Sequence, residues 1–139
     1  MPTYHEFTMH HYEAAIAMWQ DMPGIGTSDS DQPAATEQFL RRNEGCNFVA
    51  MEKEQLIGTI LCGHDGRRGY IYHLAVHPDY RRQGIASQLV AMALAGLKEN
   101  HILKCHLFVF DQNETGIAFW ASDGWEMRDD LEIMSKYLS

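Results

Sequence analysis

Apolar residues recur along the chain with helical and strand periods in turn, which predicts a fold that mixes the two. Residues 3–8 (TYHEFT) predict a short first strand, and apolar residues at helical spacing predict a helix over residues 9–22. Residues 23–35, punctuated by prolines and rich in Gly, Ser and Asp, predict a loop. Residues 36–43 (TEQFLRRN) predict a short second helix, with Thr36 as a candidate N-cap.

The middle of the chain alternates apolar segments with turn sequences. Three antiparallel strands are predicted over residues 48–52, 56–63 and 70–76, separated by turns at EKEQ and HDGRRG. A helix is then predicted from Gly84, because apolar residues recur after it at the spacing of one helix face. This stripe consists of Ile85, Leu89, Met92, Ala93, Gly96 and Leu97.

The last third of the chain predicts one more strand, a helix and a closing strand. Residues 102–110 (ILKCHLFVF) are almost wholly apolar, and a strand, a helix and a second apolar strand in succession indicate a parallel βαβ unit. Residues 113–123 predict a helix with Gly124 just beyond its end, and residues 125–138 predict at least one closing strand. We therefore expect a single domain, residues 1–139, of the α/β (α+β) class.

Composition narrows the classes of function. Hydrophobic residues make up 45% and charged residues 22%, and the excess of acidic residues gives a formal net charge of −8. Neither nucleic acid nor membrane is an expected partner, because an acidic protein repels both unless its cations are clustered, and no apolar stretch approaches the ~20 residues of a membrane span. The three cysteines show no CxxC spacing, and the N-terminus lacks a signal-peptide core, which predicts a cytoplasmic protein with free thiols.

The stretch HPDYRRQGIASQLV, residues 77–90, contains the most specific chemistry in the sequence. A proline ends the preceding strand, and the first amides of the following helix have no intrahelical partner and lie at the positive end of its dipole. Such a site suits phosphate, and the guanidinium groups of Arg81 and Arg82 fit phosphate oxygens. Gly84 and Ala86 leave the backbone open to an anion. On these residues alone, a solvated turn before a helix is the alternative interpretation.

This stretch resembles motif A of the GNAT superfamily of acetyl-CoA-dependent N-acyltransferases, in which a strand ending in Val precedes [RQ]-x-x-G-x-[GA]. In LAVHPDYRRQGIA, the signature positions are Arg81, Gly84 and Ala86. NETGIAFWASDGW, residues 113–125, resembles the second motif of that family, Asn-x-x-Ala followed by Tyr and Gly-aromatic. The resemblance implies the GNAT fold, a mixed central sheet of about 6–7 strands with a splayed parallel strand pair, flanked by about 4 helices.

The resemblance also implies how acetyl-CoA, the acyl-donor cosubstrate, would bind, and it implies no metal. The pantetheine arm would pair like an added strand with Leu74, Ala75 and Val76, and a backbone amide close to Leu74, near a bulge, would polarise the thioester carbonyl. Asn113 would contact the arm or support the helix that lines it. The pyrophosphate would rest on the amides of the motif A turn, which belong to Arg82, Gln83, Gly84, Ile85, Ala86 and Ser87.

The implied reaction is direct attack of an amine on the thioester in a ternary complex, and the residues for proton transfer depart from the family pattern. Trp120 occupies the usual tyrosine position; its indole N–H would contact the CoA arm but is no acid near neutral pH. Phe108 and Phe110 occupy positions where some relatives have a carboxylate base. Strand alternation places Tyr72 on the face of the CoA-binding residues and His73 on the opposite face. Tyr72 is therefore the candidate proton carrier, and a buried packing role is the alternative.

Two polar loops are candidates for binding the acceptor, a small-molecule amine or a protein N-terminus or lysine. Asp29 and Asp31, in the loop of residues 23–35, would bind a cationic amine. Arg67 or Arg68, in the HDGRRG turn, would bind an acceptor carboxylate. A solvated loop is the alternative for both segments.

The missing proton-transfer residues keep a second function open, a non-catalytic GNAT-like protein that binds CoA as a sensor or partner. A covalent acyl-cysteine route is not favoured, because Cys62 and Cys105 lie in strand patterns and are expected to be buried small hydrophobes. Dimers are common among GNAT proteins, so the resemblance allows a homodimer.

Overall fold

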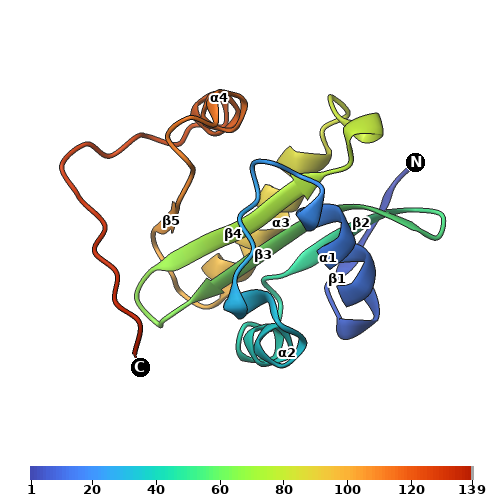
Figure 1. The fold of residues 1–139 in the computed structure, drawn as a ribbon, viewed down its shortest axis with the longest axis horizontal. Coiled ribbons are helices and arrows are strands. Elements are labelled where there is room, and N and C mark those ends of the chain that lie inside the picture. Colours follow the sequence, from blue (N-terminus) through green and yellow to red (C-terminus); the bar gives the residue numbers. More distant parts are fainter. Residues whose placement is uncertain (139) are drawn as a thin grey trace. The chain divides into compact units, whose positions relative to one another are not determined.

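The computed structural model describes residues 1–138 and contains one five-stranded sheet in the order β1-β2-β3-β4-β5 (Figure 1). Neighbouring strands are antiparallel except β4 and β5, which are parallel. This arrangement confirms the predicted mixed α/β class and the βαβ unit, although the number of strands is lower than predicted. The strands are β1 (Thr3–Glu6), β2 (Phe48–Glu52), β3 (Gln55–His64), β4 (Gly69–Val76) and β5 (Cys105–Leu107).

Residues 1–138 contain four α-helices, as predicted. They are α1 (Tyr12–Gln20), α2 (Pro33–Arg42), α3 (Ile85–Glu99) and α4 (Glu114–Ser122). None of them, within residues 1–138, has the length and hydropathy of a membrane span. The chain divides into two compact units, the first ending at Phe108 and the second beginning at Val109. The organisation as a single domain, residues 1–139, stays a prediction.

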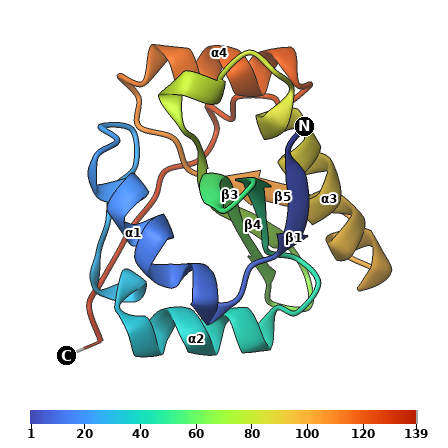
Figure 2. The ribbon, with the colours of Figure 1, turned by 90° about the vertical axis from the view of Figure 1, so that its right-hand side faces the viewer.

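In the first unit, α1 and α2 lie on one face of the sheet and α3 on the other (Figure 2). The predicted apolar stripe of α3 is confirmed, because Ile85, Leu89 and Leu97 are buried against the strands. Glycines in the strands allow this close approach. A Cβ at Gly58 would lie 3.2 Å from Ile85 and Leu89, and one at Gly69 would lie 2.5 Å from Leu97.

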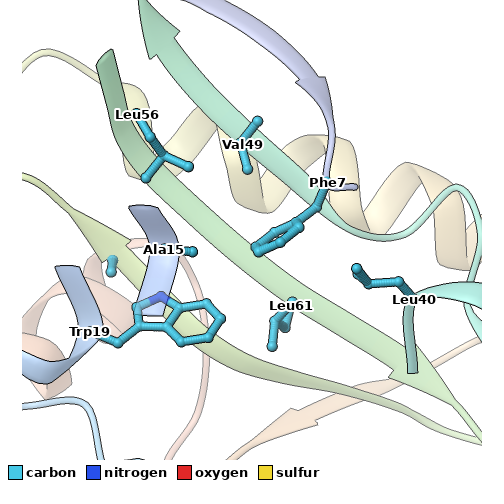
Figure 3. Packing of buried hydrophobic residues seen from close by; sticks show 8 residues of the cluster. Phe7, Ala15, Trp19, Leu40, Val49, Leu56 and Leu61 are labelled. Carbon is cyan, nitrogen blue, oxygen red and sulfur yellow. The ribbon is translucent and has the colours of Figure 1, made fainter. Parts of the chain in front are cut away.

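The face toward α1 and α2 buries an apolar cluster around Trp19 (Figure 3). The Trp19 side chain is fully buried, with Phe7 and Leu61 in the same cluster. Its indole N–H donates a hydrogen bond to Thr59 Oγ1 at 2.9 Å, so the one polar atom of this side chain is satisfied inside the core.

Two element boundaries differ from the sequence prediction. Helix α2 begins at Pro33 rather than at Thr36. Proline suits the first helical position, because it lacks the backbone N–H that would be unpaired there. Thr36 is consequently a buried residue within the helix and not its cap. The predicted strand over residues 102–110 is reduced to Cys105–Leu107, because only these residues pair with β4.

The closing strand predicted over residues 125–138 is absent from the described chain, which accounts for the lower strand count. Most of its apolar side chains, including Leu131 and Ile133, are exposed. Alternating apolar residues favour a strand only where a neighbouring strand accepts the backbone hydrogen bonds.

Gly96 tests how closely α3 packs on the rest of the first unit. A Cβ at Gly96 would overlap the carbonyl oxygen of Gly45. We expect Gly96→Ala to lower the free energy of unfolding by about 1–3 kcal/mol in urea titrations followed by circular dichroism. Helix propensity alone predicts the opposite, a gain of about 1 kcal/mol. A more stable Gly96→Ala variant would therefore contradict the packing, and Ala95→Gly, at an exposed position of the same helix, calibrates the propensity effect.

Candidate active site

Strand β4 contains a bulge in its middle. Tyr72 and Ala75 are three residues apart in β4 but pair with Leu61 and Thr59, which are two apart in β3. One extra residue is thereby inserted into β4. The bulge contains His73, whose φ of 43° is left-handed and costly for a residue other than glycine.

The bulge overturns the predicted assignment of faces in β4. The His73 ring lies 4.6 Å from the ring of Trp19, and the Tyr72 ring lies 6.0 Å from that of Phe39 on α2. Tyr72 and His73 therefore both face the α1–α2 side. Val76 pairs with Gly58 and faces α3, so the prediction that His73 opposes Tyr72 while Val76 joins it is wrong. The cause is the inserted residue, which shifts the alternation by one.

The edge of β4 that faces β5 is open over its second half. Strand β5 pairs with β4 only from Gly69 to Ile71, and its strand geometry ends at Leu107. Residues 72–76 of β4 consequently have no partner in β5, as expected for a splayed parallel pair. An open strand edge presents backbone donors and acceptors to an extended ligand. The candidate pantetheine-binding residues Leu74, Ala75 and Val76 lie in this open half.

Tyr72 stands at the point where the two strands separate. Its side chain is 40% exposed and makes an edge-to-face contact with Phe39. Partial burial raises the pKa of the Tyr72 phenol above its ordinary value, with smaller contributions from neighbouring Tyr70 and the thiols of Cys62 and Cys105. Tyr72 is therefore a phenol at neutral pH, a state that can donate a proton but cannot act as a base.

The chain leaves β4 through a turn with two left-handed residues. They are Arg82, with φ of 62°, and Gly84, with φ of 80°, which is the N-cap residue of α3. Arg81 ties the turn to the end of β4, because its Nε donates to the carbonyl oxygen of Val76 at 3.2 Å. A Cβ at Gly84 would meet nothing within 4 Å, so this approach to the backbone is open.

The helix that follows this turn presents unpaired amides. Its first bond runs from the Gln88 N–H to the Gly84 carbonyl oxygen at 3.0 Å, so the amides of Ile85, Ala86 and Ser87 have no acceptor within the helix. With the positive end of the helix dipole and two exposed arginines, this turn has the donors and charge that two phosphates require.

The two acidic candidates for binding the acceptor, Asp29 and Asp31, differ in how far they are exposed to solvent. Asp31 is 5% exposed, and its Oδ1 lies 2.8 Å from His73 Nε2 while its Oδ2 accepts the Ser28 N–H at 2.9 Å. Its carboxylate is engaged inside the first unit and is not open to an amine. Asp29 is exposed and remains available as an acceptor contact.

The two arginine candidates lie far from the bulge. Asp65 holds their turn, because its Oδ1 accepts the N–H groups of Arg68 at 2.9 Å and Arg67 at 2.8 Å, and these bonds lower the pKa of Asp65. The turn precedes Gly69 and the bulge follows Tyr72, so roughly 17 Å of strand separates the arginines from Leu74. The structure does not bring Arg67 and Arg68 together with the other candidate residues.

Cys62, on the strand next to Tyr72, is not an activated nucleophile. Hydrogen bonds with the thiols of Cys105 and Cys46, together with burial, raise the pKa of Cys62. Cys62 pairs with Ile71, so it faces away from Tyr72, and a high pKa leaves it as a thiol. Among residues 1–138, no cluster of three or more potential ligands is arranged to hold a metal ion.

In the second unit, Asn113 is the N-cap residue of α4. Its Oδ1 accepts the Gly116 N–H at 3.0 Å, which satisfies one of the free amides at the start of the helix. Gly124, with φ of 95°, follows the end of α4 as predicted. The Trp120 ring packs edge-on against that of Trp125 at 5.0 Å. Contacts of Asn113 and Trp120 with a CoA arm stay predictions.

Comparison with known proteins identifies the family. The profile described as "Acetyltransferase (GNAT) family" matches residues 11–125. The chain belongs to the GNAT acetyltransferase family. A curated relative of this GNAT protein, "Acetyltransferase SG1711" of Sodalis glossinidius (strain morsitans), is 30% identical over 127 residues, which are 91% of this chain and 89% of the relative.

Solved structures share the GNAT fold at lower identity. The PaiA N-acetyltransferase of Thermoplasma acidophilum in complex with coenzyme A has a TM-score of 0.80 at 19% identity, over 93% of this chain and 92% of the other. A predicted acetyltransferase of Clostridium acetobutylicum with acetyl-CoA has a TM-score of 0.78 at 20% identity, over 97% and 96% of the two chains. These likenesses confirm the predicted fold.

Sequence reasoning missed the partnership of Asp31 with His73. The two residues are 42 positions apart, and the bulge that turns His73 toward Asp31 contains no glycine to signal it. Strand alternation was the only available guide to His73, and the inserted residue invalidates it.

The protonation state of Tyr72 can be checked by titration. We expect the difference in tyrosinate absorbance between the wild-type protein and Tyr72→Phe to develop only above about pH 10, because burial favours the neutral phenol. N-acetyltyrosinamide supplies the reference titration of an unperturbed phenol. A Tyr72 signal that develops below about pH 9 would show an activated phenolate and contradict this assignment.

Proposed function

We propose that this GNAT protein transfers the acetyl group of acetyl-CoA to an amine acceptor by direct attack in a ternary complex. One observation carries the proposal: the open half of β4 leads directly into the left-handed turn at the start of α3. The strand edge that would pair with the pantetheine arm and the turn that would bind the phosphates of CoA are thus consecutive in the chain, within one compact unit.

In the proposed complex, Leu74, Ala75 and Val76 pair with the pantetheine arm, and the amides of residues 82–87 bind the pyrophosphate. The arginines of the turn add charge-assisted bonds to the phosphate oxygens. The occurrence of coenzyme A and acetyl-CoA in GNAT neighbours supports this assignment. By the family motif, Asn113 and Trp120 of the second unit are further proposed contacts with the arm.

The bulge suits the proposed chemistry, because His73 and Leu74 lie outside the pairing between β3 and β4. A backbone N–H released from a ladder can bond the thioester carbonyl and stabilise the oxyanion that forms as the amine attacks. The C–S bond then breaks, and the departing thiolate takes a proton from the Tyr72 phenol, directly or through water. The proton that the attacking nitrogen loses as the amide forms restores the phenol, through solvent. The amine must first lose its own proton, since only the neutral form is nucleophilic.

The acceptor is proposed to approach from the α1–α2 side, which Tyr72 faces. Exposed Asp29 is the remaining acidic contact there for a cationic amine. The class of amine, a homodimer and a cytoplasmic location stay predictions.

Arg82 tests the phosphate site. We expect Arg82→Glu to raise the Kd for CoA at least ~10-fold in calorimetric titrations, because charge-assisted contacts to phosphate are lost and a like charge is introduced. Arg42→Glu, on the exposed end of α2, makes the same change in net charge and serves as the control. Equal effects of the two substitutions would argue for a general charge effect and against a phosphate site at this turn.

Catalysis is tested by release of free thiol from acetyl-CoA in the presence of a panel of small amines and amino-terminal peptides. For any acceptor that supports turnover, we expect Tyr72→Phe to lower kcat by about 10²-fold, since a positioned proton donor contributes on that scale, with little change in Kd for acetyl-CoA. Tight binding of acetyl-CoA without turnover on any amine would instead favour a non-catalytic CoA-binding protein.

A further inference from the structure

Side chains from four segments of the first unit form a continuous series of hydrogen bonds around the β4 bulge. On one side, Trp19 Nε1 donates to Thr59 Oγ1 at 2.9 Å, and Thr59 Oγ1 donates to the His73 carbonyl oxygen at 2.9 Å. On the other side, the His73 ring bonds the Asp31 carboxylate through Nε2 at 2.8 Å. The hydroxyl of Tyr12 on α1 donates to the Asp31 carbonyl oxygen, which returns the series to the helix where it began.

This series holds His73 by its backbone and its side chain at once. Its carbonyl oxygen is bound from β3, its ring is bound from the loop before α2, and the ring also packs on Trp19. A left-handed residue other than glycine costs on the order of 1–3 kcal/mol and persists only where its surroundings determine it. The bonds from Thr59 and Asp31 are what determine it here.

The Asp31 carboxylate lies between two partners. Its Oδ1 is 2.8 Å from His73 Nε2, and in this contact an ionised carboxylate accepts from a ring N–H. Asp31 Oδ2 accepts the Ser28 N–H, so both of its oxygens are occupied by donors. An asparagine at position 31 has one acceptor oxygen and no charge. If that oxygen keeps the Ser28 N–H, the NH₂ group meets His73 Nε2, and a bond forms there only when the ring carries its hydrogen on Nδ1.

From these contacts we infer that Asp31 and Thr59, acting through His73, are positioning residues for acetyl transfer. They hold the bulge that displaces Leu74 from the pairing with β3, and thereby place the amide that polarises the thioester carbonyl. The inference rests on the proposed function, because it requires acetyl-CoA on the open edge of β4. Asp31 thus acts on the acyl group through the backbone, and not as the amine contact that its sequence position predicted.

A purely structural role would not require this chemistry. Apolar side chains of similar size fill a core as well as, or better than, buried polar ones, and a buried carboxylate is costly unless every oxygen is paired. This polar series instead holds the one left-handed residue of β4. Acetyl transfer requires exact placement of the backbone there, since a shift of about 1 Å at a reacting group can lower the rate ~10²-fold.

The test measures carbonyl polarisation without an acceptor. Acetyl-CoA carrying carbon-13 at the thioester carbonyl is bound to the full chain. The stretching frequency of this carbonyl is recorded by isotope-edited infrared spectroscopy, and the Kd for acetyl-CoA is measured by calorimetry. In the wild-type protein we expect the frequency to fall on binding, because the amide at the bulge bonds the carbonyl. We expect Thr59→Val and Asp31→Asn to lose at least about half of that fall while Kd changes by less than ~3-fold, because the carbonyl loses its aligned donor and the pyrophosphate site is untouched.

Two matched controls separate positioning from general damage. Thr59→Ser retains the hydroxyl and is expected to retain the full frequency shift, which a loss of core packing would not allow. Asp21→Asn removes an exposed carboxylate at the end of α1 and is expected to change neither quantity. If Asp31→Asn fails to fold, the Thr59→Val and Thr59→Ser pair decides.

The outcomes also distinguish this inference from the proposed function. A wild-type protein that does not bind acetyl-CoA overturns the proposed function and the inference with it. Three other outcomes overturn the inference but not the proposed function. The wild-type protein binds acetyl-CoA without a frequency shift, or both Thr59→Val and Asp31→Asn keep the full shift, or Thr59→Val and Thr59→Ser lose equal parts of it.

Discussion

The left-handed backbone of His73 is the constraint on which the rest of the site depends. It inserts one residue into β4, turns Tyr72 and His73 to the α1–α2 side, and leaves Val76 facing α3. It also removes Leu74 from the pairing with β3. A flat, regular β4 would place these groups on other faces and would have no backbone amide free for a thioester.

The two halves of the candidate site are built in different ways. The CoA side is local: the open edge of β4, the left-handed turn and the first amides of α3 follow one another in the chain, and close packing of α3 on glycines of the sheet holds them in place. The side proposed for the acceptor is assembled from distant segments, because α1, the loop before α2 and the bulge of β4 meet through tertiary contacts that include those of His73 with Trp19 and Asp31. A sequence motif can describe the first kind of site and not the second.

Sequence patterns predicted those features that depend on neighbours in the chain. The buried stripe of α3, the end of α4 before Gly124 and the parallel crossover follow from periodicity and turn chemistry. The predictions failed where a feature depends on remote partners. Residues 125–138 have an apolar pattern but no strand pairing in the structure, and Asp31 looks like a loop carboxylate in sequence but is buried against β4.

The sequence by itself determined the class of fold and the turn proposed to bind phosphate, because two arginines and a glycine directly before an apolar helix stripe supply a positive charge and an accessible backbone locally. Only the tertiary structure decided which face of the sheet receives Tyr72 and His73, and what Asp31 does. The physical reason is that the bulge contains no glycine to favour it locally; hydrogen bonds from Thr59 and Asp31, far away in the chain, stabilise a backbone conformation that the local sequence disfavours.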